Sequence, residues 1–149
     1  MKWKWFLAAT LFFCTTVTCA ADIAKAAELN HYPGPKHVLQ LANQLQLSEE
    51  QRQRTQRVFD EMNSKAINLG KQLVEKERLL DSRFAAANIS DAELLHLVSE
   101  ISDLQGKIRA AHLQAHLAER AVLTADQLVR YDALRGYQAT GSHVQHDGH

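Results

Sequence analysis

The sequence predicts an all-α protein built around one long antiparallel helical hairpin. No proline follows Pro35 in the 149-residue chain, and Ala, Leu, Gln, Glu, Lys and Arg dominate the part behind it, which is typical of helices. Strand-like alternation of apolar and polar residues is absent. Three phrases, in which Ser or Thr is followed three residues later by Gln or Glu, divide this part: "SEEQ" from Ser48, "SDAE" from Ser90 and "TADQ" from Thr124. Such a hydroxyl caps a free backbone N–H while the later side chain reaches back, so each phrase marks a helix start.

The first two helices follow from these boundaries. A short helix is predicted over residues 35–45, because Pro35 suits a first-turn position. The second runs from Ser48 to about Ala86 and, at ~1.5 Å per residue, would be roughly 60 Å long. Gly70 weakens this helix without ending it. Its apolar stripe has the spacing of a coiled-coil seam and consists of Val58, Met62, Ala66, Leu69, Leu73, Leu80 and Phe84.

The third helix is predicted from Ser90 to about Ala121, and the link "AAANI" folds it back against the second. The fourth begins at Thr124 and ends near Gly136. The stripe of the third helix consists of Leu94, Val98, Ile101, Leu104, Ile108, Ala111, Ala115 and Ala118. The fold therefore has four helices, with the short ones at the open end of the hairpin. Because two helices bury little surface by themselves, the exposed apolar face predicts a homodimer or another partner.

Residues 1–20 have the layout of a secretory signal peptide. Lys2 and Lys4 precede an apolar run that is too short to span a membrane, and small residues follow it. Cleavage is expected after Ala20 or as late as residue 27, which leaves no stable membrane insertion. Both cysteines, Cys14 and Cys19, lie in the removed segment, so cysteine-based zinc sites and redox chemistry are excluded from the mature chain.

The mature chain divides into three parts. A linker covers residues 21–34, the helical domain covers residues 35–137, and residues 138–149 form a polar tail that we expect to be disordered.

Two of the 17 basic residues lie in the signal peptide, so 15 remain against 17 acidic residues, and this balance does not suggest nucleic acid as a partner. No catalytic triad pattern, phosphate loop or Gly-rich nucleotide turn is present, so the sequence predicts a protein that is not an enzyme.

The stretch "AHLQAHLAE" is a candidate metal site. His112 and His116 lie one helical turn apart, and two imidazoles at this spacing can share one metal ion. Glu119 could add an oxygen ligand from the same face. We expect all three residues to flank the seam without filling it. Two solvated histidines on a helix edge are the alternative interpretation, because a pair is one or two ligands short of a site.

Further histidines could complete this site or form another. His31 and His37 flank the turn "YPGP", which could bring them near the later helices, although a packed turn with incidental histidines would look the same. The tail holds His143, His146 and His149, and His-rich tracts bind divalent metals weakly and flexibly. Such a tail could equally serve solubility. The metal in question would be divalent zinc, copper or nickel, and no organic cofactor is indicated.

Two five-residue motifs stand at the starts of the second and fourth helices. "LSEEQ" at residues 47–51 and "LTADQ" at residues 123–127 resemble the paired LTxxQ motifs of the Spy/CpxP superfamily. The order of export segment, short helix, motif, long hairpin, second motif and short helix also matches that superfamily. "AAELNHYPGPKHVLQLA" and "YDALRGY" resemble its heavy-metal-resistance branch. The resemblance covers about residues 33–137.

The resemblance implies a dimeric helical hairpin in the bacterial periplasm. It implies two activities: binding of divalent heavy metal in resistance or sensing, and ATP-independent shielding of unfolded envelope proteins. The site of the superfamily's nickel/cobalt sensor is not carried over, because its first histidine pair would fall on Val38 and Ala42. We therefore predict a non-enzymatic periplasmic stress protein that binds metal and also shields unfolded proteins. The alternatives are a chaperone without a metal role and a regulatory partner of an envelope sensor kinase.

Overall fold

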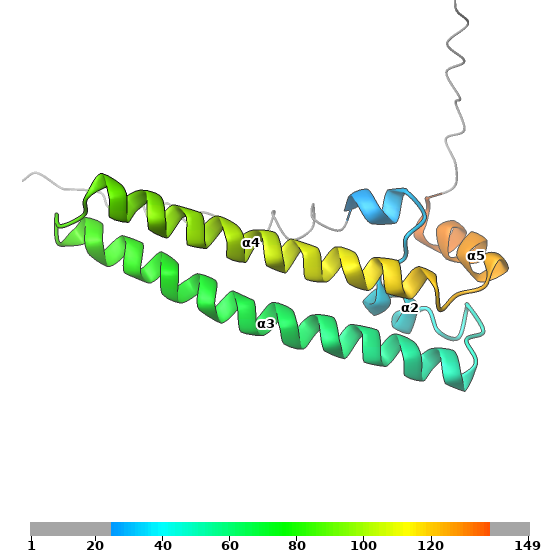
Figure 1. Cartoon of the computed structure of the whole chain (residues 1–149). Coiled ribbons are helices and arrows are strands. Elements are labelled where there is room, and N and C mark those ends of the chain that lie inside the picture. Colours follow the sequence, from blue (N-terminus) through cyan, green and yellow to red (C-terminus); the bar gives the residue numbers. More distant parts are fainter. Residues whose placement is uncertain (1–24, 138–149) are drawn as a thin grey trace, which may run out of the picture.

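Two long helices packed side by side form the body of the protein (Figure 1). The computed structural model describes residues 25–137. Its helices are α2 (Pro35–Gln40), α3 (Glu49–Ala85), α4 (Asp91–Arg120) and α5 (Ala125–Arg135), and a short helical segment at residues 25–29 precedes them. No strand occurs among the described residues. The predicted all-α class with one long hairpin and short flanking helices is therefore confirmed.

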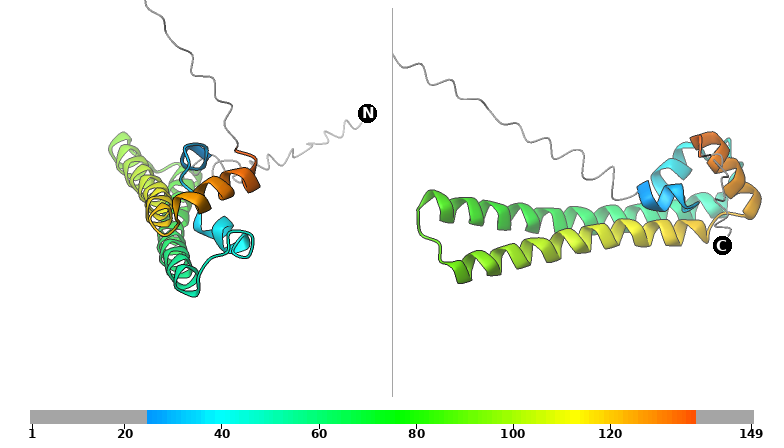
Figure 2. Two further views of the ribbon diagram at one scale, coloured as in Figure 1. Left: turned by 90° about the vertical axis from the view of Figure 1, so that its right-hand side faces the viewer. Right: turned by 90° about the horizontal axis from the view of Figure 1, so that it is seen from above.

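The short elements gather at the open end of the hairpin, and we call this part the head: residues 25–47 and 122–137 with the adjoining ends of α3 and α4. Figure 2 shows the closed end of the hairpin projecting away from the head. Residues 25–34, which the sequence suggested as part of a linker, belong to the head. Within them Glu28 is buried with 6% of its surface exposed, and Pro33 is fully buried.

The three predicted caps are present. Ser48 and Thr124 each accept a hydrogen bond from the backbone N–H three residues later, and the Gln side chain at that later position returns the bond to the cap backbone. Ser90 accepts from the Glu93 N–H. Gly136 adopts a left-handed φ of 73° directly after α5, which is the usual role of glycine behind a helix. Helix boundaries read from capping chemistry therefore agree with the structure.

The glutamines of the two LTxxQ-like motifs also bind each other. Gln51 Nε2 lies 2.7 Å from Gln127 Oε1, and Gln127 Nε2 lies 3.1 Å from Gln51 Oε1. The same amide groups donate to backbone carbonyls, Gln51 to Val122 at 3.0 Å and Gln127 to Leu45 at 3.2 Å. Each glutamine thus caps its own helix and ties that helix to another segment of the head.

Apolar residues from several segments fill the core of the head, which consists of Val38, Ala42, Leu45, Leu47, Leu123 and Tyr131. The first predicted helix was expected to reach Leu45 but ends at Gln40. Leu45 and Leu47 are both buried, whereas two residues two positions apart on a helix point about 200° apart. A left-handed φ of 52° at Gln46 turns the chain so that both side chains enter the core.

The seam between α3 and α4 follows the predicted stripes in its middle and departs from them toward both ends of α4. Leu97 is buried in place of Val98, which is 43% exposed. At the other end Glu119 is completely buried, whereas Ala118 is exposed. The prediction that Glu119 flanks the seam is therefore wrong. Helix geometry, and not apolar character, decides which residue faces the partner helix.

Away from the head, α3 and α4 cover only each other's inner faces (Figures 1 and 2). Large apolar side chains are exposed along them: Ile67, Val74, Leu79 and Phe84 on α3, and Leu95 and Val98 on α4. Leu117 is also exposed, at the end of α4 next to the head. Phe84 was expected in the stripe. None of the helices within residues 25–137 is long and apolar enough to cross a membrane.

Candidate functional site

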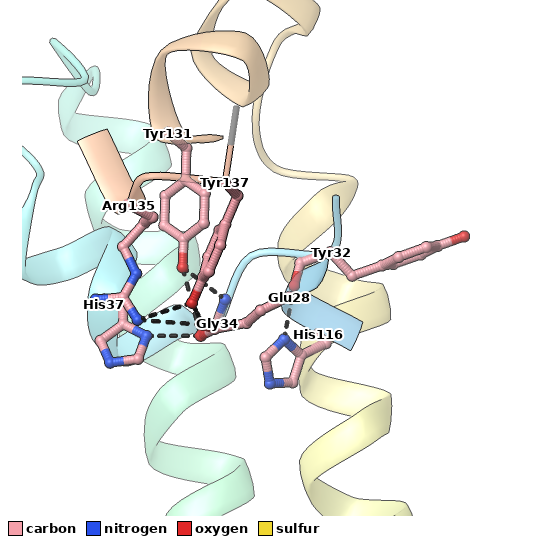
Figure 3. Close-up of polar contacts among 8 residues, drawn as sticks. All are labelled: Glu28, Tyr32, Gly34, His37, His116, Tyr131, Arg135 and Tyr137. Carbon is pink, nitrogen blue, oxygen red and sulfur yellow. Dashed lines mark hydrogen bonds and ion pairs between the residues drawn. The ribbon is translucent and has the colours of Figure 1, made fainter. Parts of the chain in front are cut away.

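A buried carboxylate, Glu28, forms the centre of a polar cluster in the head (Figure 3). It comes from the helical segment 25–29. Its Oε1 lies 2.7 Å from His37 Nδ1 on α2. Its Oε2 accepts from the Tyr137 hydroxyl at 2.5 Å and from Arg135 Nη2 at 3.2 Å. Segments from both ends of the described chain therefore meet on one carboxylate.

The environment keeps Glu28 charged. Burial raises the pKa of its carboxyl, but the hydrogen bonds from Tyr137 and His37 outweigh burial and hold the pKa below its usual value. The Tyr131 hydroxyl lies 3.5 Å from Glu28 Oε1. Burial and the nearby Glu28 charge raise the pKa of Tyr131 well above its usual range, so this hydroxyl stays protonated. An anionic Glu28 consequently accepts the proton of His37 Nδ1 and orients the imidazole.

The turn before α2 is fastened to α4. His116 Nδ1 lies 2.8 Å from the Tyr32 carbonyl oxygen, and the Arg120 guanidinium donates to the His31 carbonyl. The same guanidinium stacks on the Tyr32 ring, 4.6 Å from its centroid. These contacts place His116 beneath the turn, with only 5% of the residue exposed.

Gly34 allows the turn to approach both Glu28 and His116. A Cβ atom at this position would lie 3.1 Å from Glu28 Oε1 and 3.1 Å from His116 Cε1. Its backbone N–H donates to the Tyr131 hydroxyl at 3.4 Å. Any side chain here would push the carboxylate or the imidazole away. The glycine therefore keeps the two His-bearing parts of the head next to each other.

His31 and His112 each make a polar contact outside the Glu28 cluster. His31 Nδ1 is 2.6 Å from Asp132 Oδ2 on α5, and its side chain is 54% exposed. His112 Nδ1 is 2.9 Å from the Ile108 carbonyl one turn earlier on α4. The "YPGP" turn thus places His31 in contact with a later helix, α5.

The four head histidines (His31, His37, His112 and His116) share one hydrogen-bond arrangement. In each, Nδ1 lies within 2.9 Å of an oxygen, either of a carboxylate or of a backbone carbonyl. A carbonyl and an ionised carboxylate can only accept, so Nδ1 carries the proton. In the neutral imidazole, Nε2 then keeps the lone pair that binds metals. Histidine ligands of metal ions are usually oriented by this kind of second contact.

Glu119 plays a different role from its neighbours on α4. Its Oε1 accepts from the Thr55 hydroxyl at 2.8 Å, and its Oε2 has no hydrogen-bond partner. Both residues are completely buried between α3 and α4. Burial raises the pKa of Glu119 to about 7, against the opposing effects of the Thr55 hydrogen bond and the Arg54 charge. A carboxyl in such a place is partly protonated at neutral pH.

The head histidines do not form a ready-made metal site in the described part of the chain. No group of three or more His, Cys, Asp or Glu side chains within residues 25–137 is arranged to hold one ion. His143, His146 and His149 lie outside the described residues.

Sequence reasoning missed Glu28, because it stands in a segment taken as a linker. Its signal was a single acidic residue in the mostly apolar stretch "IAKAAEL".

Most of the chain matches a known protein family. A family model described as heavy-metal resistance matches residues 5–130. Neither the search of curated proteins nor that of solved structures gave a match. The match spans the hairpin, both LTxxQ-like motifs and all four head histidines, and it confirms the resemblance to the heavy-metal-resistance branch of the Spy/CpxP superfamily. The chain belongs to the heavy-metal resistance family.

Proposed function

We propose that this protein is a non-enzymatic heavy-metal resistance protein that binds a divalent transition-metal ion through histidines of the head. Zinc, copper and nickel are the candidate ions, because neutral imidazole is a good ligand for all three. The metal is the cargo of the protein. The observation that carries the proposal is the common arrangement of the head histidines, in which an oxygen holds Nδ1 and leaves Nε2 free.

His37 supports the proposal most directly. Its Nδ1 faces the Glu28 carboxylate, and a carboxylate in this position raises the basicity of the other ring nitrogen and fixes the ring. Its side chain is 33% exposed, so an ion can approach from solvent. His116 is oriented in the same way but is buried. We therefore assign His37 the leading role, with His31, His112 and His116 as further candidates and Glu119 as a structural residue.

Calorimetric titration of residues 21–149, without an affinity tag, tests the proposal. We expect at least one of Zn²⁺, Cu²⁺ and Ni²⁺ to bind with a Kd below about 100 μM. His37→Gln should weaken binding, since glutamine keeps an N–H for Glu28 but does not replace the imidazole as a ligand. His96→Gln is the matched control, because His96 is 72% exposed and lies on α4 away from the head. Absence of binding tighter than this limit for all three metals would refute metal binding.

The place of action and the assembly belong to the same proposal. Residues 1–20 have the pattern of an export signal, which supports a periplasmic location. The exposed apolar side chains of α3 and α4 favour a homodimer that covers part of them. A regulatory contact with an envelope sensor kinase would use the same exposed surfaces.

Shielding of unfolded envelope proteins is a second candidate function, and one surface feature favours it. Ile67 and Val74 border a shallow depression of about 450 Å³ on α3, next to Lys71, Glu75 and Arg78. Apolar side chains beside charged side chains can hold unfolded segments without a fixed sequence. We expect an equimolar amount of the protein to slow aggregation of a denatured client without ATP, both with and without chelator. Unchanged aggregation at that dose would contradict this candidate.

A further inference from the structure

We propose that Met62 is a reversible oxidation site, at which a peroxide converts the thioether into a sulfoxide while the hairpin stays folded. The sulfur of Met62 is the only one in residues 21–149, because Met1, Cys14 and Cys19 all precede residue 21. An oxidant that attacks sulfur therefore acts on this part of the chain at one side chain. The site is independent of the proposed metal binding, which uses nitrogen ligands.

Met62 lies in an open depression between α3 and α4, the two helices that run side by side in Figure 1. The depression has a volume of about 230 Å³, and Val58, Ala111 and Ala115 are among its other lining residues. Both alanines are buried, whereas Met62 is half-buried. The short alanine side chains of α4 leave room beside the longer thioether. A molecule as small as hydrogen peroxide can therefore reach the sulfur from solvent without separating the two helices.

The oxidation transfers one oxygen atom and two electrons. The sulfur lone pair attacks one oxygen of hydrogen peroxide, the O–O bond breaks, and the products are a sulfoxide and water. The reverse step requires a methionine sulfoxide reductase, in which two thiols become a disulfide and the sulfoxide oxygen leaves as water. Residues 21–149 contain no thiol, so this part of the chain cannot reduce its own sulfoxide. A reductase of this class is the enzyme that must consume the oxidised protein.

The depression also contains a partner for the new oxygen. A sulfoxide is polar and disrupts a closed apolar core, but Met62 borders solvent and polar side chains. Lys65 lines the same depression and stands three residues after Met62, a spacing that makes two side chains neighbours on a helix. Its hydrogen bond is long, because Lys65 Nζ lies 3.5 Å from Gln114 Oε1. The amino group can therefore donate to the sulfoxide oxygen, and oxidation makes this part of the hairpin polar without unfolding it.

Peroxide treatment of residues 21–149 in the presence of a chelator, followed by mass spectrometry, tests the site. We expect one added oxygen atom, located at Met62, at a rate within about tenfold of that of free N-acetylmethionine amide, because methionine oxidation follows exposure. A methionine sulfoxide reductase with a dithiol should restore the original mass of the folded protein. Met62→Leu is the matched control and should take up no oxygen. A slower reaction, or a sulfoxide that the reductase cannot reduce in the folded protein, would overturn the proposal.

Urea denaturation followed by circular dichroism tests whether the fold accepts the sulfoxide. Oxidation should lower the urea midpoint of the unmodified protein by less than about 0.5 M. It should lower that of Lys65→Ala by clearly more, because this variant lacks the donor for the sulfoxide oxygen. Lys71→Ala, a change of an exposed lysine on the same helix, should respond to oxidation like the unmodified protein. Equal shifts for all three proteins would refute the role of Lys65, and loss of the helical signal on oxidation would overturn the reversible site.

Discussion

Replacement of Tyr131 by alanine is expected to lower the free energy of unfolding by about 3–5 kcal/mol, the usual loss for a large buried aromatic side chain. Tyr131 is the largest fully buried side chain within residues 25–137, with 1% of its surface exposed. Its ring belongs to the apolar core of the head together with Val38, Leu45 and Leu123. Its removal leaves a cavity where α5 packs on the turns before α3. Urea denaturation followed by circular dichroism measures the loss.

Tyr131→Phe separates packing from hydrogen bonding. The hydroxyl contacts of Tyr131 are long, 3.4 Å to the Gly34 N–H and 3.5 Å to Glu28 Oε1. We therefore expect this variant to lose only about 1 kcal/mol. Val129→Ala on the same helix serves as the surface control, because Val129 is 72% exposed. Equal losses for Tyr131→Phe and Tyr131→Ala would show that the hydroxyl, and not the ring, holds the head together.

Glu119 is expected to make the protein less stable as the pH rises from about 4.5 to about 7. The pKa of Glu119 is raised to about 7 from its usual 4.5. The folded protein therefore binds this proton more tightly than the unfolded chain. The resulting stabilisation is complete below pH 4.5 and is lost as the pH rises through 7. At about 1.4 kcal/mol per pH unit, the loss is about 3 kcal/mol.

Glu119→Gln isolates this contribution from all other titrating groups. Glutamine keeps an oxygen for the Thr55 hydroxyl but carries no charge. The difference in unfolding free energy between the unmodified protein and the variant should therefore fall by about 3 kcal/mol between pH 4.5 and 8. Thr55→Val removes a contact that lowers the pKa of Glu119, so the fall should move to higher pH. Parallel stability curves for the unmodified protein and Glu119→Gln would contradict the argument.

Capping residues made the helix boundaries predictable from the sequence. Ser48, Ser90 and Thr124 satisfy free N–H groups within their own first turn, so their effect depends on residues three positions away. The bound Gln51–Gln127 pair was not predictable, although each glutamine was recognised as a cap. Their contact depends on how α3 and α5 are brought together in the folded head.

The candidate site was also predictable only in part, because its contacts join residues that are far apart in the chain. The histidines of α4 and of the "YPGP" turn were recognised from their types and spacing. Their partners were not, because Glu28, Asp132 and the Tyr32 carbonyl reach them across 9, 101 and 84 residues. The burial of Glu119 was missed because the stripe was traced through apolar residues alone, and alanine at position 118 fitted that stripe.

The sequence by itself determined the helices, their order, the hairpin and the family-like motifs. These properties depend on local capping, helix propensity and the spacing of apolar residues. The tertiary structure decided that Glu28 holds His37, that His116 lies beneath the turn, and that Glu119 fills the seam with Thr55. Contacts of this kind join segments that are far apart in the chain. They depend on how the helices pack, and packing also sets which polar groups lose water and must find partners inside the protein.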